Sequence, residues 1–308
     1  MGDSLPPRHF VARDSDIKAI AAFFGDPNPL HVDRIASRTI GCERGLVNQG
    51  PTNIAFAMNG LLEHCSNTGL EIARMKVRLR SPVQGSDCVV FGGQLTTVGP
   101  AVPSLTQSPF SDGDVHCEVW LDRVDATRVL DGMAILRTVR KARPAEIRSR
   151  PAGQCDENSS ARPQVSLSTR SASHKTESFL RLPPSNYEIK GHAHDYLMPI
   201  LQAPALKCNC AHPIFAYYAA QAAFGCRVDA MYSELGVPHH IGMLLGEVDM
   251  RLDRQLQVGE VLGVHARLGD PVRKTGRSGR FNVVLEEVWL HDIRGIVAFL
   301  AVTLVIPT

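Results

Sequence analysis

A short segment near the N-terminus contains the residues best suited to acid–base chemistry. In FFGDPNPLHVD, residues 23–33, a carboxylate (Asp26), a carboxamide (Asn28) and an imidazole (His31) fall within six positions. Two prolines fix the backbone φ angle and exclude a regular helix, which predicts a rigid loop. An aspartate and a histidine on one rigid loop can hold a water molecule between them, the aspartate as acceptor and the histidine as a second base or an acid. The segment therefore favours the addition of water to a double bond, or its removal.

The same pair is also compatible with a structural role, in which Asp26 caps the following helix and His31 lies on a surface loop. The neighbouring residues favour the catalytic interpretation. The sequence Gly-Asp-x-Asn-Pro-Leu-His-x-Asp, residues 25–33, resembles the hydratase motif of the MaoC-like family, the (R)-specific enoyl-CoA hydratases and 3-hydroxyacyl dehydratases of the hot-dog fold. Two further segments resemble that family in the same order, GLVNQGPT at residues 45–52 and RSPVQGSD at residues 80–87.

This resemblance covers residues 17–141 and implies roles for individual side chains. Asp26 and His31 would activate the water that adds to C3 of a trans-2-enoyl thioester, or accept the departing hydroxyl and the C2 proton in the reverse direction. Asn28 would hold that water or fix the geometry of the pair. The resemblance therefore predicts an acyl-thioester hydratase without a cofactor.

The resemblance also implies that the backbone N–H of Gly50 binds the thioester oxygen. A helix N-terminus carries unpaired N–H groups and a partial positive charge, and a preorganised donor at a developing oxyanion is worth about 3 kcal/mol. Many relatives have histidine where this chain has Gln49, so Gln49 is a candidate substrate-binding residue at a position that departs from the family. Pro51 has no N–H, which makes the donor Gly50 or a neighbour beyond it.

Two helices and two sets of strands are expected to position these residues. Residues 53–62 and 214–224 are apolar nearly all round a helix, which is typical of buried helices. Each precedes segments of β-type alternation, which predict strands at residues 72–80, 87–97, 115–124, 128–140, 244–252, 260–268, 281–290 and 295–306. A buried helix followed by an antiparallel sheet that wraps it is an α+β arrangement.

The two halves of the chain also correspond in sequence. The matched pairs are Glu118 with Glu287, Arg78 with Arg251, and Pro51 with Pro213. The two members of each pair are separated by 169 (287−118), 173 (251−78) and 162 (213−51) residues. Loop insertions of different length in the two halves would account for these small differences. The pairs occur in one order, which indicates a duplicated fold.

These observations predict a double hot-dog of three parts: an N-terminal hot-dog with the hydratase motif at residues 1–143, a flexible linker at 144–185 and a C-terminal hot-dog at 186–308. The linker is rich in serine, proline and arginine and lacks an apolar period. Residues 195–210 contain no Asp-x4-His pair. The second repeat is therefore expected to contribute packing and part of an acyl tunnel.

Composition excludes several other classes of protein. The 33 lysines and arginines nearly balance the 31 acidic residues, so nucleic-acid and membrane partners are not favoured. Scattered cysteines and an N-terminus without an apolar run predict a cytoplasmic protein. No metal is expected, because the spacing of the candidate ligands is unlike that of zinc motifs. Those ligands are His192, His194, Cys208, Cys210 and His212.

The most basic short stretch outside the linker contains Arg273, Lys274 and Arg277 in VRKTGRSGRF. It could contact the phosphates of coenzyme A or the acidic face of an acyl carrier protein. The alternative is a solvated hairpin turn, with glycines at the positions of positive φ.

The combined prediction is a hydro-lyase that interconverts trans-2-enoyl and (R)-3-hydroxyacyl thioesters of CoA or acyl carrier protein in fatty acid metabolism, as a monomer or a homodimer. One alternative is a hot-dog thioesterase, which would place its carboxylate on the long helix, where only Glu63 is found near the end. A second alternative is a non-catalytic acyl-thioester-binding subunit, because Gln49 departs from the family pattern.

Overall fold

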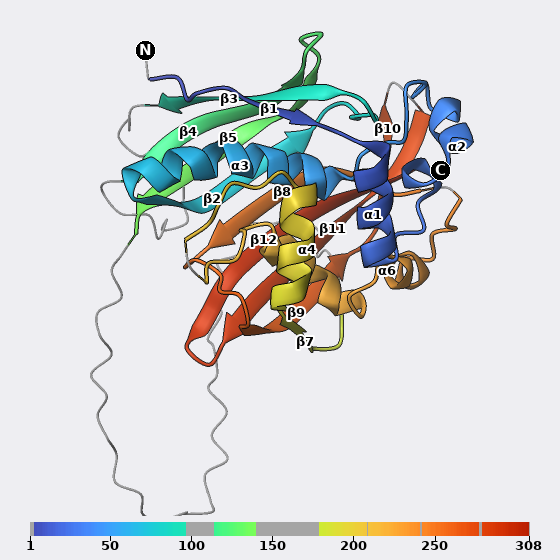
Figure 1. Cartoon of the computed structure of the whole chain (residues 1–308). Coiled ribbons are helices and arrows are strands. Elements are labelled where there is room, and N and C mark those ends of the chain that lie inside the picture. The colour runs from blue at the N-terminus through green and yellow to red at the C-terminus, as the bar shows by residue number, and fades with distance from the viewer. Residues whose placement is uncertain are drawn as a thin grey trace, which may run out of the picture.

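The computed structural model of the chain describes residues 3–96, 114–139, 179–207, 209–240, 242–276 and 279–307. Its strands form one antiparallel sheet in the order β1-β3-β4-β5-β2-β8-β12-β11-β9-β6, and β10 and β7 pair with β11 and β9 (Figure 1). The strands are β1 (Arg8–Val11), β2 (Leu70–Leu79), β3 (Cys88–Thr96), β4 (Val115–Arg123), β5 (Arg128–Thr138), β6 (Phe179–Arg181), β7 (Ser185–Glu188), β8 (Leu244–Leu252), β9 (Val261–Gly269), β10 (Val272–Gly276), β11 (Gly279–Asp292) and β12 (Gly295–Pro307). The predicted α+β class is confirmed, and all eight predicted strands are present within a few residues of their expected bounds.

Helices pack against this sheet in both halves (Figure 1). They are α1 (Asp14–Phe24), α2 (Arg34–Thr39), α3 (Gly50–Thr68), α4 (Gly191–Ile200), α5 (Phe215–Ala220) and α6 (Val228–Glu234), with 3-10 helices η1 (Pro29–His31) and η2 (Gln221–Phe224). The predicted helix at 53–62 is the central part of α3. Gly60 allows α3 to lie close to β3, because a Cβ at this position would collide with the ring of Phe91.

The second predicted helix, residues 214–224, is divided into α5 and η2. The chain tightens into 3-10 geometry at Gln221 and ends at Gly225, whose φ of 74° lies in the left-handed region that favours glycine. Apolar periodicity predicts that a segment is helical and buried, but it does not distinguish these two kinds of helical turn.

The two halves join through strands β2 and β8, which pair antiparallel. In this register Lys76 lies opposite Asp249, and these two residues are separated by 173 positions, which is the offset between Arg78 and Arg251. Two equivalent residues that face each other mark a pseudo-two-fold axis, as in an isologous dimer. The pairing therefore has the symmetry expected of a duplicated unit.

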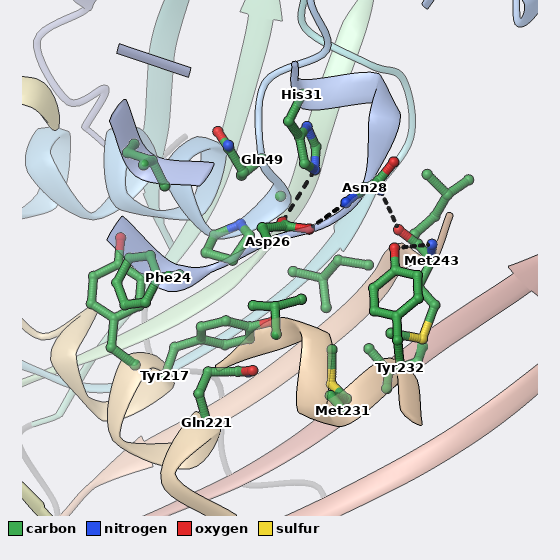
Figure 2. A pocket seen from close by; sticks show the side chains of 18 residues that line it. Phe24, Asp26, Asn28, His31, Gln49, Tyr217, Gln221, Met231, Tyr232 and Met243 are labelled. Carbon is green, nitrogen blue, oxygen red and sulfur yellow. Dashed lines mark hydrogen bonds and ion pairs between the residues drawn. The ribbon is translucent and has the colours of Figure 1, made fainter. Parts of the chain in front are cut away.

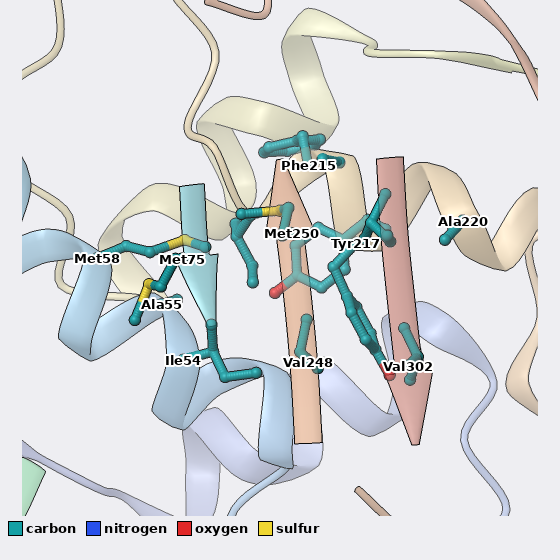
Figure 3. Close-up of a cluster of buried hydrophobic side chains, with 14 of the residues drawn as sticks. Ile54, Ala55, Met58, Met75, Phe215, Tyr217, Ala220, Val248, Met250 and Val302 are labelled. Atoms are coloured by element: carbon teal, nitrogen blue, oxygen red, sulfur yellow. The ribbon is translucent and has the colours of Figure 1, made fainter. Parts of the chain in front are cut away.

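One apolar core runs across this junction. Figure 3 shows Met58 and Met75 from the first half close to Met250 and Phe215 from the second. Because buried apolar surface is shared between the halves, we expect them to be stable only as one unit.

Several elements were not predicted from the sequence, namely β1, β6, β7, α1, α4 and α6. The expected boundary of the second repeat at residue 186 lies too late, because β6 (Phe179–Arg181) already pairs with β9. Most of the expected linker, including Cys155, lies outside the described residues. None of the helices in the described ranges combines the length and apolar character that crossing a membrane requires.

Candidate active site

The loop that carries Asp26 begins where helix α1 ends. Gly25 adopts a φ of 58° and donates its N–H to the last turn of the helix, so the chain reverses sharply there. Asn28 then caps η1, which ends at His31. The expected rigid loop is thus a helix end followed by a short 3-10 turn, and it directs the side chains of Asp26 and His31 toward one pocket (Figure 2).

Asp26 and His31 face each other without a direct hydrogen bond. The imidazole Nδ1 lies 2.7 Å from the carbonyl oxygen of Val47, which can only accept, so Nδ1 carries a proton. The other nitrogen, Nε2, lies 3.5 Å from Oδ2 of Asp26. The side chains are only 9% and 14% exposed. In the neutral imidazole, Nε2 and the carboxylate therefore face the same nearly buried space, where both can accept hydrogen bonds from one water molecule.

Both ends of the Asn28 carboxamide have protein partners. Its Oδ1 accepts from the backbone N–H of Leu30 at 3.1 Å, and its Nδ2 donates to the carbonyl of Met243 at 3.2 Å. The backbone N–H of Asn28 donates to Oδ1 of Asp26 at 3.0 Å. Of the two roles expected for Asn28, this geometry favours fixing the pair over holding the water.

Helix α3 begins at the edge of the same pocket. The side chain of Gln49 precedes the helix and donates from Nε2 to the carbonyl of Ile17 at 2.8 Å, which holds α3 against α1. Gly50 is the first helical residue, and its N–H has no hydrogen-bond partner among the described residues. A Cβ at Gly50 would lie 2.8 Å from the Cβ of Leu245, so only glycine allows β8 to come this close. The helix N-terminus therefore offers a free donor to the pocket.

The opposite wall of the pocket comes from the second half of the chain (Figure 2). Its members are Tyr217, Tyr218, Gln221, Val228, Met231, Tyr232, Met243, Leu244, Leu245 and Leu304. The ring of Phe24 in α1 packs on Tyr218 with centroids 4.4 Å apart, which attaches the loop of the first half to the second. The site is therefore shared between the repeats, and neither repeat contains it alone.

Sequence reasoning did not single out the polar members of this wall. Tyr217, Tyr218 and Gln221 lie in a segment that reads as apolar nearly all round. The available signal was a glutamine and two tyrosines within a helix that has no exposed face. The hydroxyl of Tyr232 accepts from the N–H of Met243 at 2.7 Å, and burial together with the charge of Asp26 raises the pKa of this tyrosine.

The expected basic contact lies elsewhere. Arg273 and Lys274 are exposed on β10 and do not line the pocket. Arg277 lies outside the described residues. The hairpin of β10 and β11 is present as the alternative interpretation expected, and a contact with the carrier stays a prediction.

One of the candidate metal ligands, His212, has protein partners in the core. His212 is fully buried, accepts from the N–H of Ile214 at 3.1 Å, and its Nε2 lies 2.8 Å from Oδ1 of Asn59. Burial lowers the pKa of His212 to about 3. Cys208 lies outside the described residues. Within the described ranges, no three histidine, cysteine or acidic side chains are grouped as a metal ion would require.

Comparisons with known proteins reveal similarity in structure but not in sequence. No family model and no curated protein matches the chain. A solved structure of a MaoC-like dehydratase aligns with a TM-score of 0.55 at 12% identity, covering 98% of this chain and 97% of the other. A protein from Chloroflexus aurantiacus J-10-fl named as a MaoC domain protein dehydratase aligns with a TM-score of 0.60 at 12% identity, covering 100% and 95%.

A conserved protein from Mycobacterium tuberculosis, described as having a double hot-dog fold, aligns with a TM-score of 0.56 at 10% identity, covering 99% and 96%. The predicted double hot-dog is therefore confirmed. Over nearly its whole length the chain resembles MaoC-like dehydratases in structure, while the low identities leave its reaction to be argued from the site.

Proposed function

We propose that the chain is a hydro-lyase that interconverts a trans-2-enoyl thioester and an (R)-3-hydroxyacyl thioester carried by coenzyme A or acyl carrier protein. One observation carries the proposal. Nε2 of His31 and the carboxylate of Asp26 face the same largely buried pocket 3.5 Å apart, while the other imidazole nitrogen is occupied by Val47. This arrangement suits the activation of a single water molecule.

In the hydration direction, the water would donate hydrogen bonds to Nε2 of His31 and to Asp26. As its oxygen bonds to C3, His31 would take one proton, and Asp26 would stabilise the protonated imidazole. The pair of electrons from the C2–C3 double bond would move toward the thioester carbonyl. The proton would then pass from His31 to C2, which leaves a hydroxyl on C3 and a hydrogen on C2.

The negative charge that develops on the thioester oxygen needs a donor. The N–H of Gly50 at the start of α3 has no other partner among the described residues and lies at the positive end of a 19-residue helix. We assign this donor to the thioester oxygen. Gln49 would act through its bond to Ile17, by holding the helix N-terminus in place.

The structure gives less support to the thioesterase alternative. Glu63, the carboxylate near the end of α3, is half exposed and paired with Arg8 at 2.5 Å. It does not line the pocket. A thioesterase would therefore need a different carboxylate.

A spectroscopic assay distinguishes the three functions. Crotonyl-CoA is mixed with the protein, and both the absorbance of the conjugated thioester and free thiol are followed. Loss of the conjugated absorbance without thiol release is expected. Release of thiol would instead establish a thioesterase, and binding without either change would establish a non-catalytic subunit.

A further inference from the structure

Polar atoms without partners lie in the wall of the pocket that faces the catalytic pair. Gln221 is 4% exposed and Tyr218 is 2% exposed, and both line the pocket. Oε1 of Gln221 has no hydrogen-bond partner among the described residues. The hydroxyl of Tyr218 also has none there, but Tyr218 lines a second pocket as well, beside Tyr187. A buried polar group without a partner is costly, so such groups usually have a bonding partner.

Two further hydroxyl groups supply donors to the same wall. The oxygen of Tyr232 accepts from Met243, which leaves its proton for another acceptor. Tyr217 also lines the pocket, and its pKa is raised by burial and by the nearby carboxyls of Glu286 and Asp26, so it keeps its proton. In Figure 2, Tyr217 and Gln221 reach into the pocket from the second repeat, opposite Asp26. The wall thus offers both donors and acceptors.

The charge of the pocket limits what these groups can bind. Among the described residues, its lining contains Asp26 but no lysine or arginine. A carboxylate placed here would lack a cation and would lie near the charge of Asp26. A purely alkyl chain would leave Oε1 of Gln221 unpaired. An uncharged oxygen substituent meets both conditions, because it can accept from a tyrosine and, as a hydroxyl, donate to Gln221.

We propose that the acyl group bound in this pocket carries a hydroxyl or ketone oxygen beyond C3, which Gln221 and the tyrosines of the second repeat recognise. The proposal rests on the proposed function only in taking an acyl thioester as the ligand. It assigns the repeat without a catalytic pair to substrate selection. The wall of that repeat would distinguish oxygenated acyl chains from alkyl and dicarboxylic chains.

Binding of saturated thioesters tests this proposal without catalysis, because they have no double bond to hydrate. Titration calorimetry on the full chain would compare hexanoyl-CoA, 6-hydroxyhexanoyl-CoA and adipoyl-CoA, and also pentanoyl-CoA with 4-oxopentanoyl-CoA. The better of the two oxygenated ligands is expected to bind at least about 10-fold more tightly than its alkyl counterpart, which corresponds to one net hydrogen bond. Adipoyl-CoA is expected to bind more weakly than 6-hydroxyhexanoyl-CoA.

Variants connect the preference to the named residues. Gln221→Leu and Tyr217→Phe should each reduce the ratio of oxygenated to alkyl affinity, and together they should bring it close to one. Tyr196→Phe, at an exposed tyrosine outside the pocket, should keep the wild-type ratio. Thermal unfolding of each variant would show that the fold is intact.

The outcomes separate this proposal from the proposed function. Equal or tighter binding of the alkyl thioesters, tightest binding of adipoyl-CoA, or no binding of any thioester would overturn it. A preference that survives in the double variant would also overturn it. If the oxygenated ligands are preferred but no enoyl thioester is hydrated, the hydro-lyase proposal fails and the selectivity stands. If enoyl thioesters are hydrated but the oxygenated ligands are not preferred, the hydro-lyase proposal stands and the selectivity proposal fails.

Discussion

Nε2 of His31 lies 3.5 Å from Oδ2 of Asp26, and the carbonyl of Val47 holds a proton on the other nitrogen, Nδ1, so that Nε2 of the neutral imidazole is an acceptor. Two acceptors this close need a donor between them, and a water molecule supplies one. The relationship requires the end of α1, the turn η1 and the backbone of residue 47 to meet, so the pair depends on packing as well as on spacing in the motif.

Removing either member of the pair should slow hydration strongly while the fold persists. Asp26→Asn and His31→Gln are each expected to lower kcat on crotonyl-CoA by a factor of about 100 to 10,000, the usual contribution of general acid–base catalysis. Steady-state kinetics and circular dichroism would check this. Asp33→Asn is the matched control, because Asp33 lies in the same segment but is exposed and caps α2. Retention of near wild-type kcat in Asp26→Asn would refute the assignment.

Asn28→Ala should lower both stability and kcat. The change removes the bonds to Leu30 and Met243, so a loss of about 1 to 3 kcal/mol in the free energy of unfolding is expected. On the role favoured for Asn28, which is to position Asp26 rather than to contact substrate, kcat should fall with little change in KM. Denaturant titration and kinetics would measure both effects, with Asn186→Ala on an exposed strand as control. A rise in KM alone would show that Asn28 contacts substrate.

Glu286 should make stability fall as pH rises. Burial raises the pKa of this carboxyl to about 8 from the usual 4.5, so the folded state holds a proton that the unfolded state has lost. Stability is therefore lost between about pH 4.5 and pH 8, by up to about 1.4 kcal/mol per pH unit. Glu286→Gln should flatten this decline and be more stable than wild type at pH 8.

Unfolding by denaturant at several pH values would measure the effect of Glu286. The neighbouring Glu287→Gln serves as control, because Glu287 is paired with Arg267 and is partly exposed. It should keep the decline seen in wild type. An unchanged decline in Glu286→Gln would show that the buried carboxyl is not responsible.

His212 should have the opposite effect on the acid side. Burial lowers its pKa to about 3 from 6.5, so the unfolded state binds a proton first as the pH falls. The free energy of unfolding therefore falls as the pH is lowered from about 6.5 to 3, again by up to about 1.4 kcal/mol per pH unit. His212→Gln should weaken this acid sensitivity, whereas His192→Gln, at an exposed site, should not. Thermal melts over this range would decide between the two outcomes.

The basic hairpin predicts a carrier contact outside the pocket. Arg273→Gln combined with Lys274→Gln should raise KM for a CoA thioester with unchanged kcat, and the effect should shrink with added salt as charges are screened. Arg294→Gln, in the turn between β11 and β12, is the control. An unchanged KM at low salt would assign the hairpin a purely structural role.

The sequence alone determined the architecture and the catalytic candidates. Apolar periods of 3.6 and 2 reflect burial directly, so they located the central part of α3 and placed the eight long strands within a few residues. The motif from Gly25 to Asp33 is local in the sequence, so Asp26 and His31 could be identified as the candidate pair without the structure. The correspondence of Arg78 with Arg251 indicated a duplicated fold, whereas the pairing of β2 with β8 came from the structure.

Only the tertiary structure decided which distant residues complete the pocket. Tyr217 and Gln221 come within reach of Asp26 because β2 and β8 join the two repeats into one sheet and α1 packs on α5. No periodicity in the chain encodes such a contact, since it depends on how two separately patterned units share one core. Short elements such as β6 and α4 were also missed, because they are held by pairing and packing and carry little local signal.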